Sequence, residues 1–433
     1  MSSIPDRFPA RLMDCYTDFQ TQVSEMMIQI EMEFNKELDV KRLAKAVKLT
    51  LNAEPVLGCR FVDNSYKPFF ERLDLNKHSA FFLANSQSEY DTFKSSSIEY
   101  RTGPQISVCL WHSPNGDRLL LKVAHHVADA TGAKDIAAIL SSIYRQLSDD
   151  PDYCPLPNFK EQRSLRQVLK HIPLHAYPSI FLTSLRTTWT AYNPPIVHAL
   201  TTSDGPREPL IYVNRLIPSG HVSTLADYGH SHNATLNDII IVAASRALSA
   251  MGNKKKGTHI CLTNTIDLRR HIPSGHAAAV ANLSFVRMYW PDLGVEPCQD
   301  FESTLDKVAK ITRHEKAHWF GLDIVFNTFH PVCKTIPHAW FKKLYREYME
   351  FLLKKEGGAH WFTNLGPIDT ESVTFEIQPF KAHILPPAAY PPTPFMFGLS
   401  GYNGTLTLSA GTYPTQKETV EQFFDAILKE LPV

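Results

Sequence analysis

The chain has 433 residues, of which 43% are hydrophobic and 20% are charged, and its 44 basic side chains balance its 44 acidic ones. A chain of this length exceeds one small core, so we expect two domains, or three. The zero net charge lacks the basic footprint of a nucleic-acid-binding protein. No segment has the ~18 consecutive apolar residues of a membrane helix, and residues 1–7 lack the apolar core of a signal peptide. We therefore expect a cytoplasmic protein with no nucleic-acid partner and no transmembrane segment.

The cysteine pattern also fits the expected cytoplasmic location. Seven are scattered along the chain without any Cys-x-x-Cys spacing, and several lie inside apolar runs. We therefore expect reduced, buried thiols and no structural metal site.

The first half of the chain alternates strand and helix patterns. Apolar residues at every second position predict a strand over residues 23–34, and the helix that follows it, with one apolar face, ends before Pro55. Strands are predicted again over residues 56–61 and 105–111. The second of these leads into Asn115-Gly116, a pair that is typical of a β-hairpin when apolar runs flank it.

The most informative segment follows this hairpin. Residues 119–124 have the apolar pattern of a buried strand that ends in His125, and Asp129 comes four residues later. Apolar residues at helical spacing begin at Ile136, so both side chains lie on a strand-to-helix connection. Such a connection holds a side chain at the edge of a cleft. A histidine, with an unperturbed pKa of about 6.5, accepts and returns protons near neutrality. The pattern therefore nominates His125 as a general base.

Segments rich in proline and aspartate separate two halves of the chain. Residues 149–160 have the composition of a surface connection, and similar segments occur within residues 193–206. We predict an N-terminal domain over residues 1–165, a linker region over residues 166–210 and a C-terminal domain over residues 211–433.

The second half repeats the alternation of helices and strands. Thr235 and Asp238 form a capping-box pattern that opens an apolar helix reaching about Met251. The remaining pattern predicts strands over residues 257–267, 281–288, 394–400 and 405–410, a hairpin at Asn403-Gly404 between the last two, and a helix from Gln416.

Several segments together resemble the chloramphenicol acetyltransferase-like superfamily, which includes alcohol acyltransferases, polyketide-associated acyltransferases and peptide-synthetase condensation domains. Its signature is His-x-x-x-Asp-Gly on a strand-to-helix loop, which His125 and Asp129 match, with Ala130 where glycine is usual. Five further segments look like elements of this family in the expected order: residues 38–44, 54–61, 235–240, 265–270 and 363–368.

The resemblance implies an α/β (α+β) fold of two chloramphenicol acetyltransferase-like domains with mixed sheets and an active-site tunnel at their interface. It implies an HxxxD-type acyltransferase that moves an acyl group from a thioester to a hydroxyl or amine acceptor without a covalent acyl-enzyme. His125 would take the proton of the acceptor and return a proton to the departing thiol. Asp129 would pair with an arginine instead of joining a triad, with Arg269 as the first candidate and Arg270 as the second.

The resemblance also nominates other parts of the site. For the oxyanion and substrate region, the candidates are backbone N–H groups of the loop, Asn364, Ser400 and His126, which sits at a variable position of the motif. Ala130 predicts either a remodelled turn or a weaker activity, because alanine tolerates a positive φ less well than glycine.

The expected partners are small molecules. We expect a small-molecule acyl donor and acceptor, with no permanently bound cofactor. The co-substrate would be acyl-CoA, which the lack of a carrier domain in the sequence favours, or an acyl carrier protein supplied in trans.

Two other functions compete with this interpretation. His314-Glu315-Lys316-Ala317-His318 has the His-Glu-x-x-His spacing of zinc peptidases. The position of a third ligand in one class of these enzymes falls on Ile324, which cannot bind metal, and the surrounding helix is highly charged. We therefore predict a solvated helix face and no metal site. The second alternative is a non-catalytic binding module of the same fold, to which Ala130 gives some support.

Overall fold

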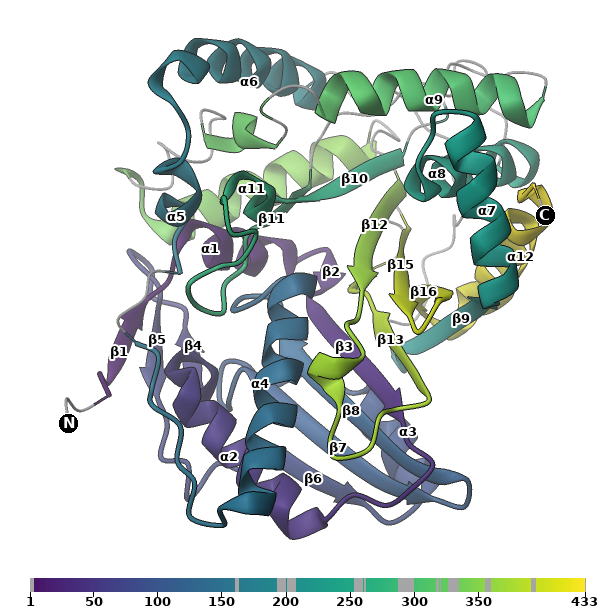
Figure 1. Cartoon of the computed structure of the whole chain (residues 1–433). Helices are drawn as coiled ribbons and strands as arrows, with labels where there is room; N and C mark the ends of the chain where they lie inside the picture. Colours follow the sequence, from purple (N-terminus) through teal and green to yellow (C-terminus); the bar gives the residue numbers. More distant parts are fainter. Residues whose placement is uncertain are drawn as a thin grey trace.

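The computed structural model describes residues 4–159, 163–192, 208–252, 262–286, 300–316, 321–325, 335–354, 360–390 and 395–432, together with Leu200, Ile260 and Trp319. It confirms the expected class, a mixed α/β fold with two mixed sheets (Figure 1). The N-terminal half contains β1 (Arg7–Pro9), α1 (Leu12–Gln20), β2 (Ser24–Glu25), β3 (Met27–Glu33), α2 (Val40–Ala53), β4 (Cys59–Val62), β5 (Phe69–Arg72), β6 (Phe81–Ala84), α3 (Gln87–Ser95), β7 (Ile106–Ser113), β8 (Gly116–Ala124) and α4 (Ala130–Asp149).

The second part of the chain begins with the helices α5 (Arg166–Leu169) and α6 (Tyr177–Tyr192). The elements that follow are β9 (Ile211–Ile217), α7 (Ser219–Ser231), α8 (Leu236–Met251), β10 (Leu262–Asp267), β11 (Ser284–Val286), α9 (Phe301–Lys316), α11 (His338–Lys354), β12 (His360–Pro367), β13 (Lys381–Leu385), β14 (Ala388–Ala389), β15 (Met396–Tyr402), β16 (Thr405–Thr412) and α12 (Lys417–Glu430).

The N-terminal sheet has the strand order β13-β3-β8-β7-β6 and carries the histidine segment on its central strand. β3 and β8 are antiparallel, and their pairing ends at Met27 opposite Ala124, immediately before His125. The expected hairpin between β7 and β8 is present, with Ser113 paired to Gly116. Gly116 has a φ of +109°, and a Cβ there would lie 2.0 Å from the carbonyl oxygen of Phe34, so only glycine fits this turn.

The C-terminal sheet has the strand order β11-β10-β12-β15-β16-β9. Helix α8 packs against α12 and α9, and its buried apolar residues, among them Ile240 and Val242, form one core with this sheet. The capping box at its start is confirmed, because Thr235 and Asp238 each bond the backbone N–H of the other.

The two halves of the chain share strands and a core. β13 crosses to the N-terminal sheet and pairs with β3, and β14 pairs with β2. Residues 166–210, expected as a linker region, contain α5 and α6. Val168 and Ile180 of these helices lie in a core cluster with Met13 of α1 and Leu268 beyond β10. This region therefore packs against both halves.

The structure differs from the strand predictions in a few places. Residues 55–58 form a 3-10 turn, with Pro55 at its start, and the strand expected over residues 56–61 begins only at Cys59. Of the strand expected over residues 281–288, the structure assigns Ser284–Val286 to β11, and residues 287 and 288 lie outside the described part. Helix α1, which the sequence analysis did not predict, packs beside the histidine segment.

Among the described helices, none is by itself both long and apolar enough to cross a membrane. Taken together, α7 and α8 reach the required length and composition, with a bend of 98° between them.

Candidate active site

A five-residue loop, residues 125–129, connects β8 to α4 at the junction of the two sheets (Figure 1). The loop begins with His125, whose backbone N–H donates to the carbonyl of Met26 at 3.1 Å. It ends with Asp129, the N-cap of α4, whose Oδ1 accepts from the N–H of Gly132 at 2.8 Å. The loop is therefore anchored at both ends by regular structure, which holds the side chains that it carries in place.

A cavity of about 80 Å³ opens beside this loop. Its walls come from both halves of the molecule, including α1, β3, β10 and β12. The polar lining residues are Thr17, Gln20, His125, Asp129, Thr131, Thr265, Asp267, Asn282, Ser284, Thr363 and Asn364, and the apolar ones include Met13, Met26, Ile28, Trp361 and Met396.

His125 faces this cavity in a form suited to accept a proton. Its Nδ1 lies 2.9 Å from the carbonyl oxygen of Ala128, which can only accept, so Nδ1 carries the hydrogen. The unprotonated nitrogen is then Nε2. Burial lowers the pKa of His125 below its ordinary value, and the nearby Asp129 charge offsets only part of this effect. The imidazole is therefore neutral at pH 7.

Asp129 is turned towards Arg269 and makes no hydrogen bond with His125. Its Oδ2 accepts from Arg269 Nη1 at 2.8 Å and from the N–H of Leu283 at 2.7 Å. Both side chains are buried. Burial would raise the pKa of Asp129, but the charge and hydrogen bond of Arg269 and the backbone donors lower it, so the carboxylate stays ionised. The structure thus brings together the two residues that the resemblance paired, and it places Arg270 in the wall of a second cavity.

Asn282 and Thr17 fasten the other end of the loop. The amide of Asn282 donates to the carbonyl of His125 at 3.0 Å and to Thr17 Oγ1 at 3.1 Å. The sequence analysis missed both residues. The apolar spacing of Leu12, Tyr16 and Phe19 could have predicted the helix that carries Thr17, but no local pattern marks Asn282.

Ala130 causes no backbone strain. It is the first residue of α4 and is not among the residues with positive φ, so this turn does not need the glycine that is usual in the motif. The glycine requirement lies two residues later. A Cβ on Gly132 would lie 2.9 Å from the carbonyl oxygen of Ala281 and 2.9 Å from Ala128 Cβ.

The other three nominated residues lie in different surroundings. Asn364 lines the cavity, but its side chain bonds Asn237 Oδ1 and the N–H of Gly366. Ser400 is buried outside the cavity lining and accepts from the N–H of Ile384 at 3.1 Å. His126 also lies outside the lining, stacked on Tyr100 with ring centroids 4.2 Å apart. The structure thus brings neither Ser400 nor His126 to the His125 cavity.

The first turn of α4 borders the cavity and carries backbone donors that the helix itself does not use. Ala130 and Thr131 are the first two residues of this helix, so their N–H groups have no intrahelical acceptor, and both residues line the cavity. The helix dipole adds partial positive charge at this end.

A second cavity, of about 430 Å³, lies beside the first. The two share Thr131, Thr265, Asp267, Asn364 and Leu365 in their walls. The second cavity adds three cationic side chains, Lys134, Arg270 and Lys316, and one carboxylate, Glu315, to the shared Asp267.

The His-Glu-x-x-His pattern falls at the end of α9. The His314 side chain is 69% exposed, and its Nδ1 lies 4.0 Å from Glu315 Oε1. His318 lies outside the described residues.

Comparisons with known proteins reveal similarity in structure only. No protein-family model matches the sequence, and no curated protein is significantly similar to it. The fold is similar to that of polyketide synthase associated protein 5 from Mycobacterium tuberculosis, with a TM-score of 0.63 and 14% identity over 97% of this chain and 98% of that one. The first condensation domain of the CDA synthetase matches with a TM-score of 0.67 and 16% identity, over 99% and 97%. The epimerization domain from the third module of tyrocidine synthetase B matches with a TM-score of 0.64 and 13% identity, over 99% and 97%.

Proposed function

Because the chain has the condensation-domain-like fold of the chloramphenicol acetyltransferase-like superfamily, we propose that it is an acyltransferase that moves an acyl group from a thioester to a hydroxyl or amine acceptor. The observation that carries this proposal is the geometry of His125. Its Nδ1 is held by the Ala128 carbonyl, and Nε2 is the nitrogen left for a substrate. Its lowered pKa keeps it in the basic form.

The proposed reaction uses this base twice. His125 Nε2 removes the proton from the acceptor O–H or N–H as the acceptor attacks the thioester carbonyl. The tetrahedral intermediate then expels the thiolate, which takes the proton from the imidazolium and leaves as the free thiol. The N–H groups of Ala130 and Thr131 are our candidates for binding the oxyanion. Arg269 and Asp129 hold the loop and do not move protons.

For the donor, we propose acyl-CoA or an acyl group on a carrier protein. Both hold the thioester at one end of a pantetheine arm and carry a phosphate at its other end. The second cavity supports this choice, because it shares wall residues with the His125 cavity and carries Lys134, Arg270 and Lys316 in its wall. The peptide-synthetase origin of several structural neighbours supports testing a carrier-protein donor beside acyl-CoA.

The test is thiol release. The protein is incubated with a panel of acyl-CoA donors or acylated carrier protein and pooled acceptors, with and without a chelator. We expect thiol release that requires an acceptor, ignores the chelator and is abolished in His125→Ala.

Three results would overturn the proposal. Chelator-sensitive peptide cleavage would support the zinc-peptidase alternative. An unchanged rate of thiol release in His125→Ala would show that His125 is not the base. Donor or acceptor binding without turnover across the panel would favour the non-catalytic binding module.

A further inference from the structure

A buried carboxylate lies directly behind the catalytic loop. Asp18 belongs to α1, the helix that lines the His125 cavity with Met13, Thr17 and Gln20. Asp18 itself is completely buried and does not line that cavity. One helix therefore contributes both the wall of the cavity and a charged group on the far side of that wall.

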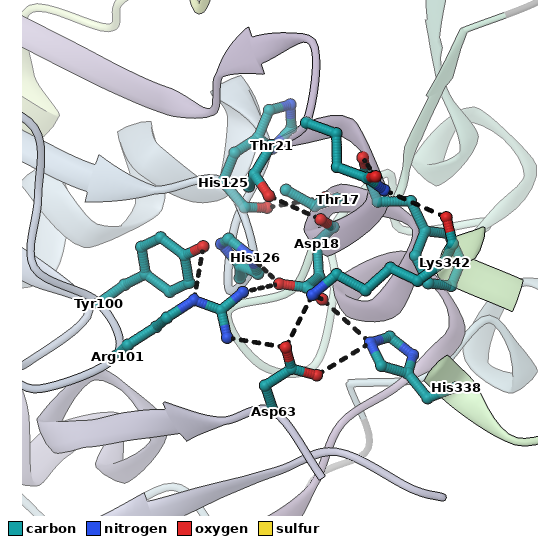
Figure 2. A network of polar contacts seen from close by, with 12 residues as sticks. Thr17, Asp18, Thr21, Asp63, Tyr100, Arg101, His125, His126, His338 and Lys342 are labelled. Atoms are coloured by element: carbon teal, nitrogen blue, oxygen red, sulfur yellow. Dashed lines mark hydrogen bonds and ion pairs between the residues drawn. The ribbon is translucent and has the colours of Figure 1, made fainter. Parts of the chain in front are cut away.

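Three donors and the ring of His126, from three separate segments, surround the Asp18 carboxylate (Figure 2). Arg101 Nη2 lies 2.5 Å from Oδ1, and His126 Nε2 lies 3.7 Å from the same atom. On the other oxygen, His338 Nε2 and Lys342 Nζ of α11 both lie 3.0 Å away. Burial would raise the pKa of Asp18, but these contacts outweigh it and hold the pKa well below the ordinary value. The carboxylate is therefore ionised.

Asp63 completes the network without making it a metal site. Its carboxylate contacts Lys342 Nζ at 2.7 Å and Arg101 Nη1 at 3.2 Å. Ligand atoms of Asp18, Asp63 and His338 lie within 4.8 Å of one another. However, Lys342 already bridges both carboxylates, and with Arg101 it balances their charge.

Asp18 touches the catalytic loop by two routes. Through space, it faces His126, the residue after His125, whose ring also packs on Tyr100 and Phe61. Within the described part of the chain, neither ring nitrogen of His126 has a hydrogen-bond partner, so the Asp18 charge is its principal polar contact. Along the chain, Asp18 directly follows Thr17. The Asn282 amide donates to Thr17 Oγ1 and also to the carbonyl of His125.

We propose that Asp18 is a positioning residue for His125. A buried group of charges is a weak source of stability compared with apolar packing, and one established use of such a group is to fix a single geometry. Asp18 fixes α1 and His126 relative to each other, and so keeps the Ala128 carbonyl opposite His125 Nδ1 and leaves Nε2 for the cavity. The inference rests on the proposed role of His125 as the base.

The experiment measures which ring nitrogen of His125 carries the hydrogen. Imidazole ¹⁵N spectra of the full chain are recorded at pH 8, and the His125 signals among the 19 histidines are assigned by their loss in His125→Gln. In the wild type, we expect the separated signals of a fixed Nδ1–H tautomer. In Asp18→Asn, the two signals should move towards each other as the tautomers exchange. Unchanged His125 signals in Asp18→Asn would overturn the proposal.

The matched control is Asp117→Asn. Asp117 is also a buried carboxylate bonded to a histidine, with Oδ1 at 2.6 Å from His112 Nδ1, but it lies at the opposite end of β8 from His125. We expect Asp117→Asn to leave the His125 signals unchanged. A shift as large as that of Asp18→Asn would show a general effect of removing a buried charge and would overturn the proposal.

A double variant tests whether the effect of Asp18→Asn comes from lost positioning of His125 or from an unbalanced buried charge. Asp18→Asn with Lys342→Met removes one carboxylate and one cation, which keeps the balance and protects folding. The proposal expects the tautomers still to exchange, and restoration of the wild-type signals would contradict it. In the thioester assay, Asp18→Asn should lower kcat by up to ~100-fold, since a shift of about 1 Å can have that effect. The spectra require no turnover, so they test the positioning even if the proposed activity fails.

Discussion

Asp129 binds Arg269 at 2.8 Å across the junction of the two halves, whereas His125, four residues before it, bonds the Ala128 carbonyl instead. The aspartate therefore anchors the loop, and the histidine takes its tautomer from the backbone. This relationship separates the residue that is proposed to move protons from the residues that hold it in place.

Loss of Arg269 should destabilise the fold. In Arg269→Met, the buried Asp129 carboxylate keeps only its backbone donors, and removal of one partner of a buried pair costs ~3–5 kcal/mol. Urea unfolding followed by circular dichroism measures the change. The control is Lys310→Met, which removes an ion pair with Asp306 whose side chains are 68% and 63% exposed, and which should cost ~1 kcal/mol or less. Equal losses in the two variants would contradict the anchoring role of Arg269.

The acid limb of the pH–rate profile should lie below the ordinary histidine pKa. Burial lowers the pKa of His125 from 6.5, so the neutral form persists as the pH falls through 6.5 and is lost only below that value. The measurement is kcat/KM for thiol release between pH 4.5 and 8. His112→Gln, on β7, should leave the limb in place. A midpoint above 6.5 would contradict a buried neutral base.

Gly132→Ala should impair the site although alanine favours helices. Its Cβ would meet the Ala281 carbonyl at 2.9 Å, so the first turn of α4 and with it the loop must move. We expect lower thermal stability and slower thiol release. Gly220→Ala in α7 is the matched control, because nothing lies within 4 Å of its Cβ, and it should stabilise by ~0.4–1 kcal/mol. A Gly132→Ala variant as stable and active as the wild type would show that a Cβ fits beside the Ala281 carbonyl without displacing the loop.

Glu54 should make stability depend on pH. Burial raises its pKa from 4.5 to about 7, and the bond from Asn158 Nδ2 at 2.7 Å only partly offsets this. The folded state thus holds the proton more tightly, so the stabilisation is present below pH 4.5 and is lost as the pH rises to 7. Glu54→Gln mimics the protonated form and should gain up to ~3 kcal/mol over wild type at pH 8 and little at pH 4.5. Urea unfolding at both pH values measures this. Exposed Glu37→Gln should change little at either pH, and a Glu54→Gln variant without a gain at pH 8 would refute the prediction.

The amino-acid sequence by itself determined the features that depend on neighbouring residues. The β7–β8 hairpin, the capping box at Thr235 and the strand-loop-helix around His125 follow from turn chemistry, capping and side-chain periodicity, which act over a few residues. The motif resemblance added Arg269 as the partner of Asp129, although 140 residues separate them.

Only the tertiary structure decided which side chains meet at the loop. Asn282 is 157 residues from His125, and His338 is 320 residues from Asp18, so no local pattern links them. The tertiary structure also brings His126 close to Asp18, places Ser400 away from the cavity and starts α4 at Ala130, which therefore needs no left-handed backbone. The physical reason is that hydrogen bonds, charges and exclusion of water depend on distance in space, which this fold sets by placing β13 and α11 against segments far away in the chain.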